Sequence, residues 1–150
     1  MGNLKIKGQP DIQGMVFNYD ISGKCSLKAG GRVFAFAAVD NLEQLQHAYD
    51  FLRNIGLEVM VMGSGTNILF HQDFTNIGVL QLGRDFKHIS NAKGLIKAGA
   101  AANLGKVIVE GAKIGYDLSP LSGIPGTIGG AIKGNSGNIC SYVDSIRYFS

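Results

Sequence analysis

The sequence lacks the features that mark several classes of protein. It has only 3 prolines, and its 22 glycines follow no Gly-X-Y period, which excludes a fibrous chain. It contains no apolar run long enough to span a membrane and no signal peptide. Its 2 cysteines and 3 histidines are scattered, so no metal site is expected. We therefore expect a cytoplasmic protein with reduced cysteines and no membrane partner.

The chain also lacks a strong excess of positive or negative charge. The net charge of +3 is too small to indicate nucleic acid binding, and it suits a small anionic ligand equally well. Of the 150 residues, 45% are hydrophobic, which is enough for one core or two small lobes. The excess of glycine predicts many tight turns.

The first half of the chain carries the pattern strand–helix–strand. Residues 32–39 place Phe34 and Phe36 on one face, as a strand does, and residues 57–62 form a buried apolar strand. A helix between them makes the two strands a parallel pair joined by a right-handed crossover.

That helix, residues 40–56, has both ends marked. Asp40 is the expected N-cap, Glu43 completes a capping box, and Gly56 stands where helices end. One stripe of apolar residues is expected to face the core: Leu42, Leu45, Tyr49, Leu52 and Ile55.

The second half predicts shorter elements. Strands are expected at 78–82 and 95–100, and a helix at 103–115 with Asn103 as its N-cap. Residues 119–137 hold 6 of the 22 glycines and no regular period, which predicts a long structured loop. Residues 142–150 predict a last strand.

These elements divide the chain into an N-terminal extension, 1–27, a first lobe, 28–85, and a second lobe, 86–150. Because the last predicted strand reaches the final residue, we expect that the sequence is shorter than the working protein, with a C-terminal substrate domain absent.

Two glycine-rich loops carry the functional signal. In "GSGTN" the glycines admit positive φ, so successive N–H groups can converge on an anion. Ser64 and Thr66 add hydroxyl donors, and the Asn67 amide can hold the loop to itself. A nicotinamide fingerprint is excluded because Ile68 stands at its third glycine, and neither loop has the Gly-Lys-Ser/Thr ending of a P-loop.

The second loop, "SGIPGTIGG", offers similar chemistry. Pro125 stiffens it and Thr127 supplies a hydroxyl. The expected backbone donors are the N–H groups of Gly123, Gly126, Gly129 and Gly130. Two such loops predict a clamp that grips a diphosphate from two sides.

The strings "VMGSGTNILF" and "LSGIPGTIGGAIKGNSG" resemble the UDP-N-acetylenolpyruvoylglucosamine reductase (UDP-N-acetylmuramate dehydrogenase) family. The upstream "SLKAGGRVFAFAAVDNLEQL" is similar to that family's entry segment, so the resemblance runs from about Cys25 to the end. The chain departs from the family pattern at Ser64, Thr66 and 135–146, where the family often has Asn-Ala-Gly-Ala-Tyr-Gly.

The resemblance implies an α+β, two-lobed FAD-binding fold of the PCMH/vanillyl-alcohol-oxidase type, not a Rossmann fold. It implies FAD held noncovalently, because Asn67 closes the loop in which covalently flavinylated relatives place a histidine. The implied cofactor-binding residues are Met62, Gly63, Ser64, Gly65, Thr66, Asn67 and Ile68, and Ser122, Gly123, Ile124, Pro125, Gly126, Thr127, Gly129, Gly130 and Ala131.

The implied reaction is the NADPH-linked reduction of UDP-N-acetylglucosamine enolpyruvate to UDP-N-acetylmuramate in peptidoglycan precursor synthesis, by a monomer. The family's catalytic Ser, Arg and Glu belong to motifs beyond Ser150, so no catalytic residue is assigned here and the chain alone is expected to be inactive. Two alternatives stay open: another flavin oxidoreductase of this fold, and a noncatalytic, truncated nucleotide-binding domain.

Overall fold

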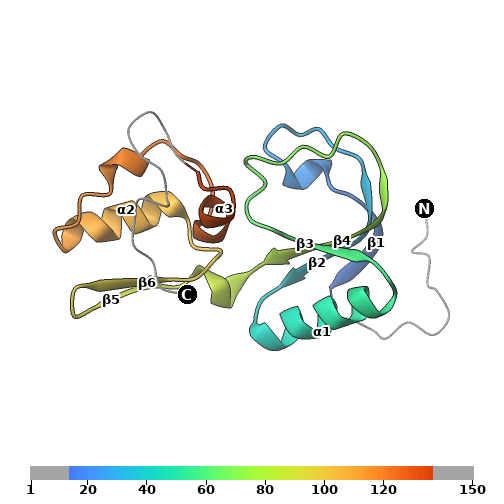
Figure 1. The fold of residues 1–150 in the computed structure, drawn as a ribbon, viewed down its shortest axis with the longest axis horizontal. Coiled ribbons are helices and arrows are strands. Elements are labelled where there is room, and N and C mark those ends of the chain that lie inside the picture. Colours follow the sequence, from blue (N-terminus) through green and yellow to red (C-terminus); the bar gives the residue numbers. More distant parts are fainter. Residues whose placement is uncertain (1–13, 137–150) are drawn as a thin grey trace. The chain divides into compact units, whose positions relative to one another are not determined.

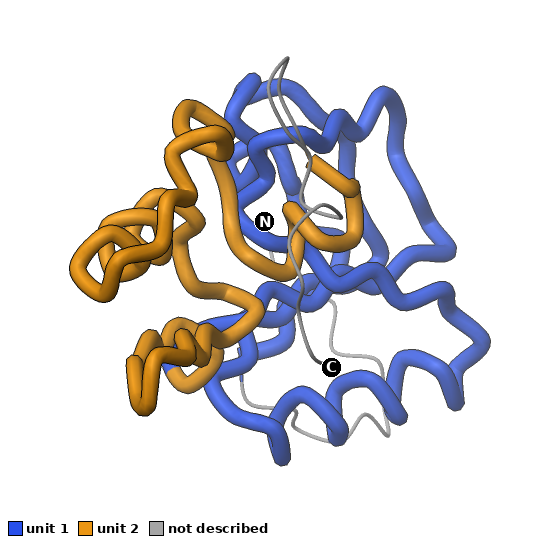
Figure 2. The backbone as a smooth tube through the Cα atoms, turned by 60° about the vertical axis from the view of Figure 1, so that its left-hand side comes forward, with its two compact units in different colours: residues 1–84 blue, residues 85–150 orange. Residues whose placement is uncertain are grey.

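The computed structural model describes residues 14–136. The chain divides into two compact units, Met1–Arg84 and Asp85–Ser150 (Figures 1 and 2). Each unit has its own sheet: four strands in the first and two in the second. Within the described residues, no helix is long and apolar enough to cross a lipid bilayer.

The sheet of the first unit has the strand order β1-β2-β4-β3. Its strands are β1 (Met15–Asp20), β2 (Arg32–Val39), β3 (Glu58–Met62) and β4 (Phe74–Leu82). β1 is antiparallel to β2, whereas β2 and β3 are both parallel to β4. The predicted pairing of β2 with β3 is therefore wrong. The chain makes a second crossover after β3, and this brings β4 between the two strands.

Two features of the strands differ from expectation. β1 lies within the expected N-terminal extension, yet it pairs with β2 along its length. A bulge between Val33 and Ala35 turns Phe34 towards Phe17 and α1, while Phe36 stacks on Tyr19. Phe34 and Phe36 thus lie on opposite faces, because the bulge interrupts the alternation of side chains.

Helix α1 (Leu42–Asn54) covers one face of the sheet, below it in Figure 1. Its N-cap is Asn41, whose side chain accepts the N–H of Gln44, and not Asp40 as predicted. Ala48 and Leu52 are buried against the sheet, so the expected stripe is correct only in part. Three of its members are largely exposed: Leu42, Tyr49 and Ile55.

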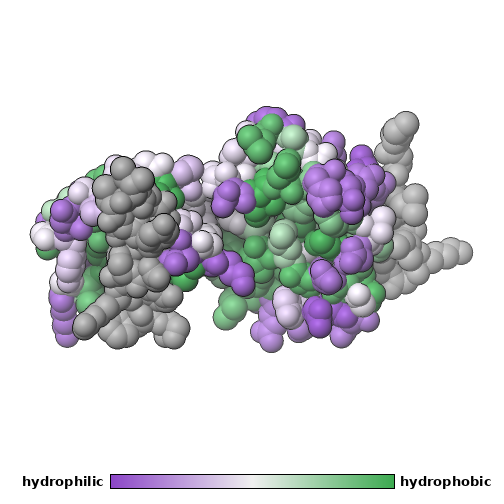
Figure 3. Space-filling view, turned by 45° about the horizontal axis from the view of Figure 1, so that its top comes forward, coloured by the Kyte–Doolittle hydropathy of each residue, from purple (hydrophilic) through white to green (hydrophobic). Residues whose placement is uncertain are grey.

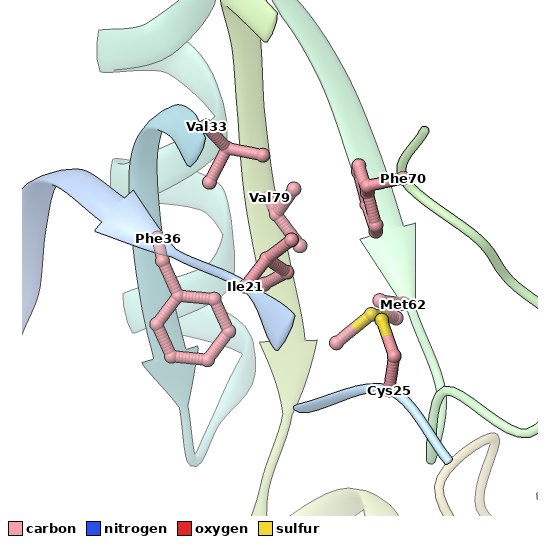
Figure 4. Packing of buried hydrophobic residues seen from close by; sticks show 7 residues of the cluster. All are labelled: Ile21, Cys25, Val33, Phe36, Met62, Phe70 and Val79. Atoms are coloured by element: carbon pink, nitrogen blue, oxygen red, sulfur yellow. The ribbon is translucent and has the colours of Figure 1, made fainter. Parts of the chain in front are cut away.

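The opposite face is covered by loops and the short helix η1 (Ser22–Lys24). Figure 4 shows the core beneath them. The buried cluster comprises Ile21, Cys25, Val33, Phe36, Met62, Phe70 and Val79. Cys25 is a free thiol next to Met62, and Cys140 lies outside the described residues. This core fixes the end of β3, from which the first glycine loop starts.

The boundary between the units lies within η2 (Arg84–Lys87), and the second unit begins at Asp85. It contains the hairpin β5 (Ile89–Ala92) and β6 (Leu95–Ala98), then α2 (Leu104–Lys113), η3 (Ser119–Leu121) and α3 (Ile128–Lys133). Asn103 caps α2 as predicted, through a hydrogen bond from the N–H of Lys106. The expected loop 119–137 instead contains η3 and α3. The strand predicted at 142–150 lies outside the described residues.

Candidate functional site

The first glycine loop lies at the carboxyl end of β3. It opens the crossover 63–73 that leads to β4, and this crossover contains no helix. Ligands of open sheets with parallel strands bind outside the carboxyl ends of those strands. The loop therefore exposes its own backbone at the edge where such sheets bind ligands.

Gly65 has no room for a side chain. Its φ of +69° is in the left-handed region, and a Cβ atom there would overlap the carbonyl oxygen of Lys24. The turn that follows η1 thus packs directly on the loop. The predicted need for glycine at this position is met, and the contact with Lys24 is what imposes it.

Two hydrogen bonds hold the carbonyl groups of the loop. The side-chain amide Nε2 of Gln81, on β4, donates to the carbonyl oxygen of Gly63 at 3.0 Å. The backbone N–H of Ser26 donates to the carbonyl oxygen of Gly65 at 2.9 Å. Because the C=O and N–H of a trans peptide point in opposite directions, these bonds turn the N–H of Ser64 away from Gln81.

Three N–H groups of the loop have no hydrogen-bond acceptor among the described residues. Within residues 14–136, the N–H groups of Ser64, Gly65 and Asn67 donate no hydrogen bond. The side chain of Asn67, expected to hold the loop to itself, has no such bond to any described residue either. Gln81 and Ser26 do that work instead. No sequence motif pointed to them, because they are distant along the chain.

The segment packed on the loop is basic. Residues 22–28 include Lys24 and Lys28 and no acidic residue. The Nζ of Lys24 lies 5.1 Å from the ring centre of Phe36, and the Nζ of Lys28 donates to the carbonyl oxygen of Gly23 at 3.3 Å. Two lysines and no acidic residue in the segment that packs on the loop favour an anionic ligand on this side of the unit. Burial raises the pKa of the Cys25 thiol, so this cysteine stays neutral.

The surface around this loop is partly apolar. Leu27, in the segment that packs on the loop, is 70% exposed, and Leu69, just after the loop, is 55% exposed. Figure 3, which brings the loop side of the first unit forward, shows hydrophobic residues gathered there with hydrophilic ones around them. A ligand with both an anionic and an aromatic part suits such a surface.

In the second loop, two of the four expected glycine N–H donors are not used in hydrogen bonds among the described residues. Gly123 and Gly126 have φ of +84° and +134°, and a Cβ at Gly123 would meet open space. Their N–H groups donate no hydrogen bond within residues 14–136. The role of these two glycines as backbone donors to a ligand stays a prediction.

The donor roles predicted for Gly129 and Gly130 are wrong. The N–H of Gly129 donates to the carbonyl oxygen of Ala100 at 2.8 Å, and that of Gly130 donates to Oγ1 of Thr127 at 3.3 Å. The cause is α3: Thr127 is its N-cap, so its hydroxyl serves the helix. A Cβ at Gly129 would lie 3.0 Å from Ala100, so this glycine permits close packing.

The remaining residues of the second loop are divided between core and surface. Ala131 is buried with Leu104 and Leu121, and Ile124 packs against the same cluster. Ser122 and Pro125 are exposed. The first stretch, Met62–Ile68, thus runs from the last residue of β3 into the loop that follows it. The second, Ser122–Ala131, runs from a loop into the first turn of α3.

Comparison with known proteins decides the family. The model of the FAD binding domain family matches residues 34–147. This chain belongs to that family. The domain is 35% identical to the UDP-N-acetylenolpyruvoylglucosamine reductase of Ruegeria pomeroyi over 134 residues, 86% of this chain and 42% of the relative. It is 37% identical to that of Jannaschia sp. over 127 residues, 83% of this chain and 40% of the relative.

A solved structure agrees with these relatives. The FAD binding domain matches the crystal structure of UDP-N-acetylenolpyruvylglucosamine reductase from Thermus caldophilus with a TM-score of 0.64 and 26% identity, over 85% of this chain and 44% of that chain. The predicted resemblance and the α+β fold of the PCMH/vanillyl-alcohol-oxidase type are confirmed. The chain spans about two fifths of the length of the curated relatives named above.

Proposed function

We propose that the chain binds FAD noncovalently, with the diphosphate against the backbone of Met62–Ile68. The observation that carries this proposal is the pair of hydrogen bonds from Gln81 and Ser26 to the carbonyl groups of Gly63 and Gly65. They turn the acceptors of the loop inward and leave its donors outward, and outward N–H groups are what a diphosphate requires. Membership of the FAD binding domain family supports the choice of dinucleotide.

We propose that the second loop, Ser122–Ala131, lies along the same dinucleotide. The N–H groups of Gly123 and Gly126, which donate to no residue in the described part of the chain, are its donors to the ligand. Thr127 orders the loop by capping α3. Residues 62–68 contain no histidine, which agrees with a noncovalent link. Of the four backbone donors expected in the second loop, the proposed clamp therefore uses two, because the N–H groups of Gly129 and Gly130 are bonded within the chain.

The proposed reaction is the reduction of UDP-N-acetylglucosamine enolpyruvate to UDP-N-acetylmuramate, with NADPH as reductant, in peptidoglycan precursor synthesis. FAD, when bound, supplies hydride transfer between NADPH and this substrate. The contribution of this chain is to bind and orient the dinucleotide. The named relatives support this step of cell wall biogenesis, and with it roles in cell shape and cell division.

We propose that this chain alone does not turn over the UDP-sugar, because it spans 42% of the reductase of Ruegeria pomeroyi. No catalytic Ser, Arg or Glu is assigned to it. Three statements stay predictions: that the protein is a monomer, that it is cytoplasmic, and that its FAD-binding lobes are residues 28–85 and 86–150.

A titration tests the proposal. FAD is added to the full chain while flavin absorbance and the melting temperature are followed, with NAD⁺ as the comparison dinucleotide. A ligand that binds only the folded state stabilises it by RT ln(1 + [L]/Kd), about 2.7 kcal/mol at a concentration of 100 Kd. We expect a saturable rise with FAD and a smaller one with NAD⁺ at the same concentration, because both carry a diphosphate and only FAD carries the flavin. A chain that is folded, colourless and unaffected by FAD would overturn the proposal.

Two further titrations, one with ADP and one with the UDP-sugar, separate the alternatives. A noncatalytic nucleotide-binding domain would bind ADP and FAD equally well, whereas an FAD-binding domain binds FAD more tightly because the flavin adds contacts. Another flavin oxidoreductase would bind FAD but would show no interaction with the UDP-sugar when joined to the downstream part of its own coding sequence.

A further inference from the structure

Gln81 is a polar residue of β4 that no glycine motif includes. It is the strand partner of Met62, the last residue of β3, and its side chain is half-buried. Its Nε2 reaches past Met62 to the carbonyl oxygen of Gly63. A half-buried amide that bonds to the first peptide of the loop controls how that peptide is oriented.

The orientation needs such control because the residues concerned are flexible. Glycine rotates easily about both backbone dihedrals, so the peptide between Gly63 and Ser64 can turn over at small cost. If it turned over, its carbonyl oxygen would replace the N–H of Ser64 at the outer surface of the loop. An oxygen in that place would repel a diphosphate.

The second tether does not replace the first. The N–H of Ser26 holds the carbonyl oxygen of Gly65, one peptide beyond Ser64, and the left-handed φ of Gly65 is fixed by contact with Lys24. These contacts fix the later part of the loop. The peptide between Gly63 and Ser64 is tethered through Gln81, and among described residues its carbonyl oxygen accepts from that side chain.

We propose that Gln81 is a positioning residue for the dinucleotide: its side-chain amide holds the Gly63 carbonyl inward, so that the N–H of Ser64 faces the diphosphate. The inference rests on the proposed binding of FAD by this loop. It adds a residue outside the loop on which the affinity for the diphosphate depends.

Three variants of the full chain test this. Gln81→Leu removes the amide at similar size, and Gln81→Glu puts a carboxylate oxygen against the Gly63 carbonyl oxygen. Gln81→Lys keeps a donor of similar reach. Gln46→Leu, at an exposed position of α1, is the matched control for the loss of a surface amide.

The readouts are the dissociation constants for FAD and for ADP, from flavin fluorescence and from competition, and the melting temperature of the apo protein. We expect Gln81→Leu and Gln81→Glu to weaken both ligands by about tenfold, the order of one lost polar contact. Gln81→Lys and Gln46→Leu are expected to bind within about twofold of the unchanged chain, because both retain a donor to Gly63.

The outcomes separate the two proposals. If the unchanged chain binds no FAD, the proposed function fails and this inference falls with it. If the unchanged chain binds FAD and the Leu and Glu variants bind FAD and ADP equally well, only the role of Gln81 is overturned. The same holds if FAD affinity falls while ADP affinity does not, since the effect would then not lie at the diphosphate. If the Leu variant does not fold, the Glu and Lys pair decides.

Discussion

The backbone N–H of Ser26 donates to the carbonyl oxygen of Gly65 across a distance of 2.9 Å. The connection between β1 and β2 therefore forms one wall of the loop that follows β3. The same contact excludes any side chain at Gly65, where a Cβ would meet the carbonyl of Lys24. The cradle is thus built from two segments that are far apart in the sequence.

The first prediction concerns this contact. Gly65→Ala adds a Cβ where there is no room and forces alanine to adopt a φ of +69°. We expect a loss of about 1–3 kcal/mol in the free energy of unfolding, measured with urea, and weaker FAD binding. Gly23→Ala is the control, since a Cβ at Gly23 meets nothing within 4 Å. Equal effects of the two substitutions would contradict the close contact.

The second prediction concerns the cap of α3. Thr127→Val keeps the shape of the side chain but removes the oxygen that accepts the N–H of Gly130. We expect this change to lower the free energy of unfolding by about 1 kcal/mol, while Thr127→Ser keeps most of it. Urea denaturation of both variants gives the comparison. A Val variant as stable as the Ser variant would show that the cap contributes nothing.

The third prediction tests which face of α1 is buried. Leu52 is fully buried, and a Cβ at Gly78 would lie 2.7 Å from its Cδ1 atom. Leu52→Ala is expected to cost about 2–5 kcal/mol of stability. Leu42 is 69% exposed, so Leu42→Ala should cost about 0.5 kcal/mol or less. Thermal or urea unfolding measures both, and equally large losses at the two positions would restore the stripe predicted from the sequence.

The fourth prediction is a pH dependence at Asp20. Hydrogen bonds from the side chain and the backbone N–H of Ser22, with a smaller contribution from the charge of Arg32, hold the pKa of Asp20 below its ordinary value of 3.8. Because the folded-state pKa is depressed, the stabilisation is present above the unfolded value and is lost as pH falls through the folded pKa.

Asp20→Asn should therefore have a lower urea midpoint than the unchanged chain at neutral pH. The difference should shrink as the pH is lowered below 3.8 and through the depressed folded-state pKa of Asp20, where the carboxyl group takes up its proton. The effect is small, since the carboxylate is exposed to solvent. A difference that stays constant over this range would show that the charge of Asp20 is not involved.

Local signals in the sequence predicted the elements whose determinants are local. The N-cap Asn103 and the left-handed Gly115 mark both ends of α2, and the predicted bounds of β2 are correct. At α1 the signals competed. Asp40 and Asn41 are both good N-cap residues. Gln44 favours Asn41, because its backbone N–H donates to the Asn41 side chain and its side-chain oxygen accepts the N–H of Asp40.

Nonlocal contacts decide what the sequence could not show. The place of β4 between β2 and β3 depends on a crossover whose path no periodicity encodes. α3 was missed because Gly129 and Gly130 are poor helix formers, and tertiary bonds such as that from Gly129 to Ala100 hold the helix in place. In the site, the glycines could be predicted from their spacing, whereas Gln81 and Ser26 lie near them only in the folded chain.

The most direct test of the central claim follows the backbone amide of Ser64 by ¹⁵N NMR while FAD, and then ADP, is added to the full chain. Because a hydrogen bond to a diphosphate oxygen deshields an amide proton, the Ser64 resonance should move downfield, and it should saturate with the same dissociation constant as the flavin fluorescence. Saturable binding of FAD with the Ser64 resonance unmoved would contradict the account.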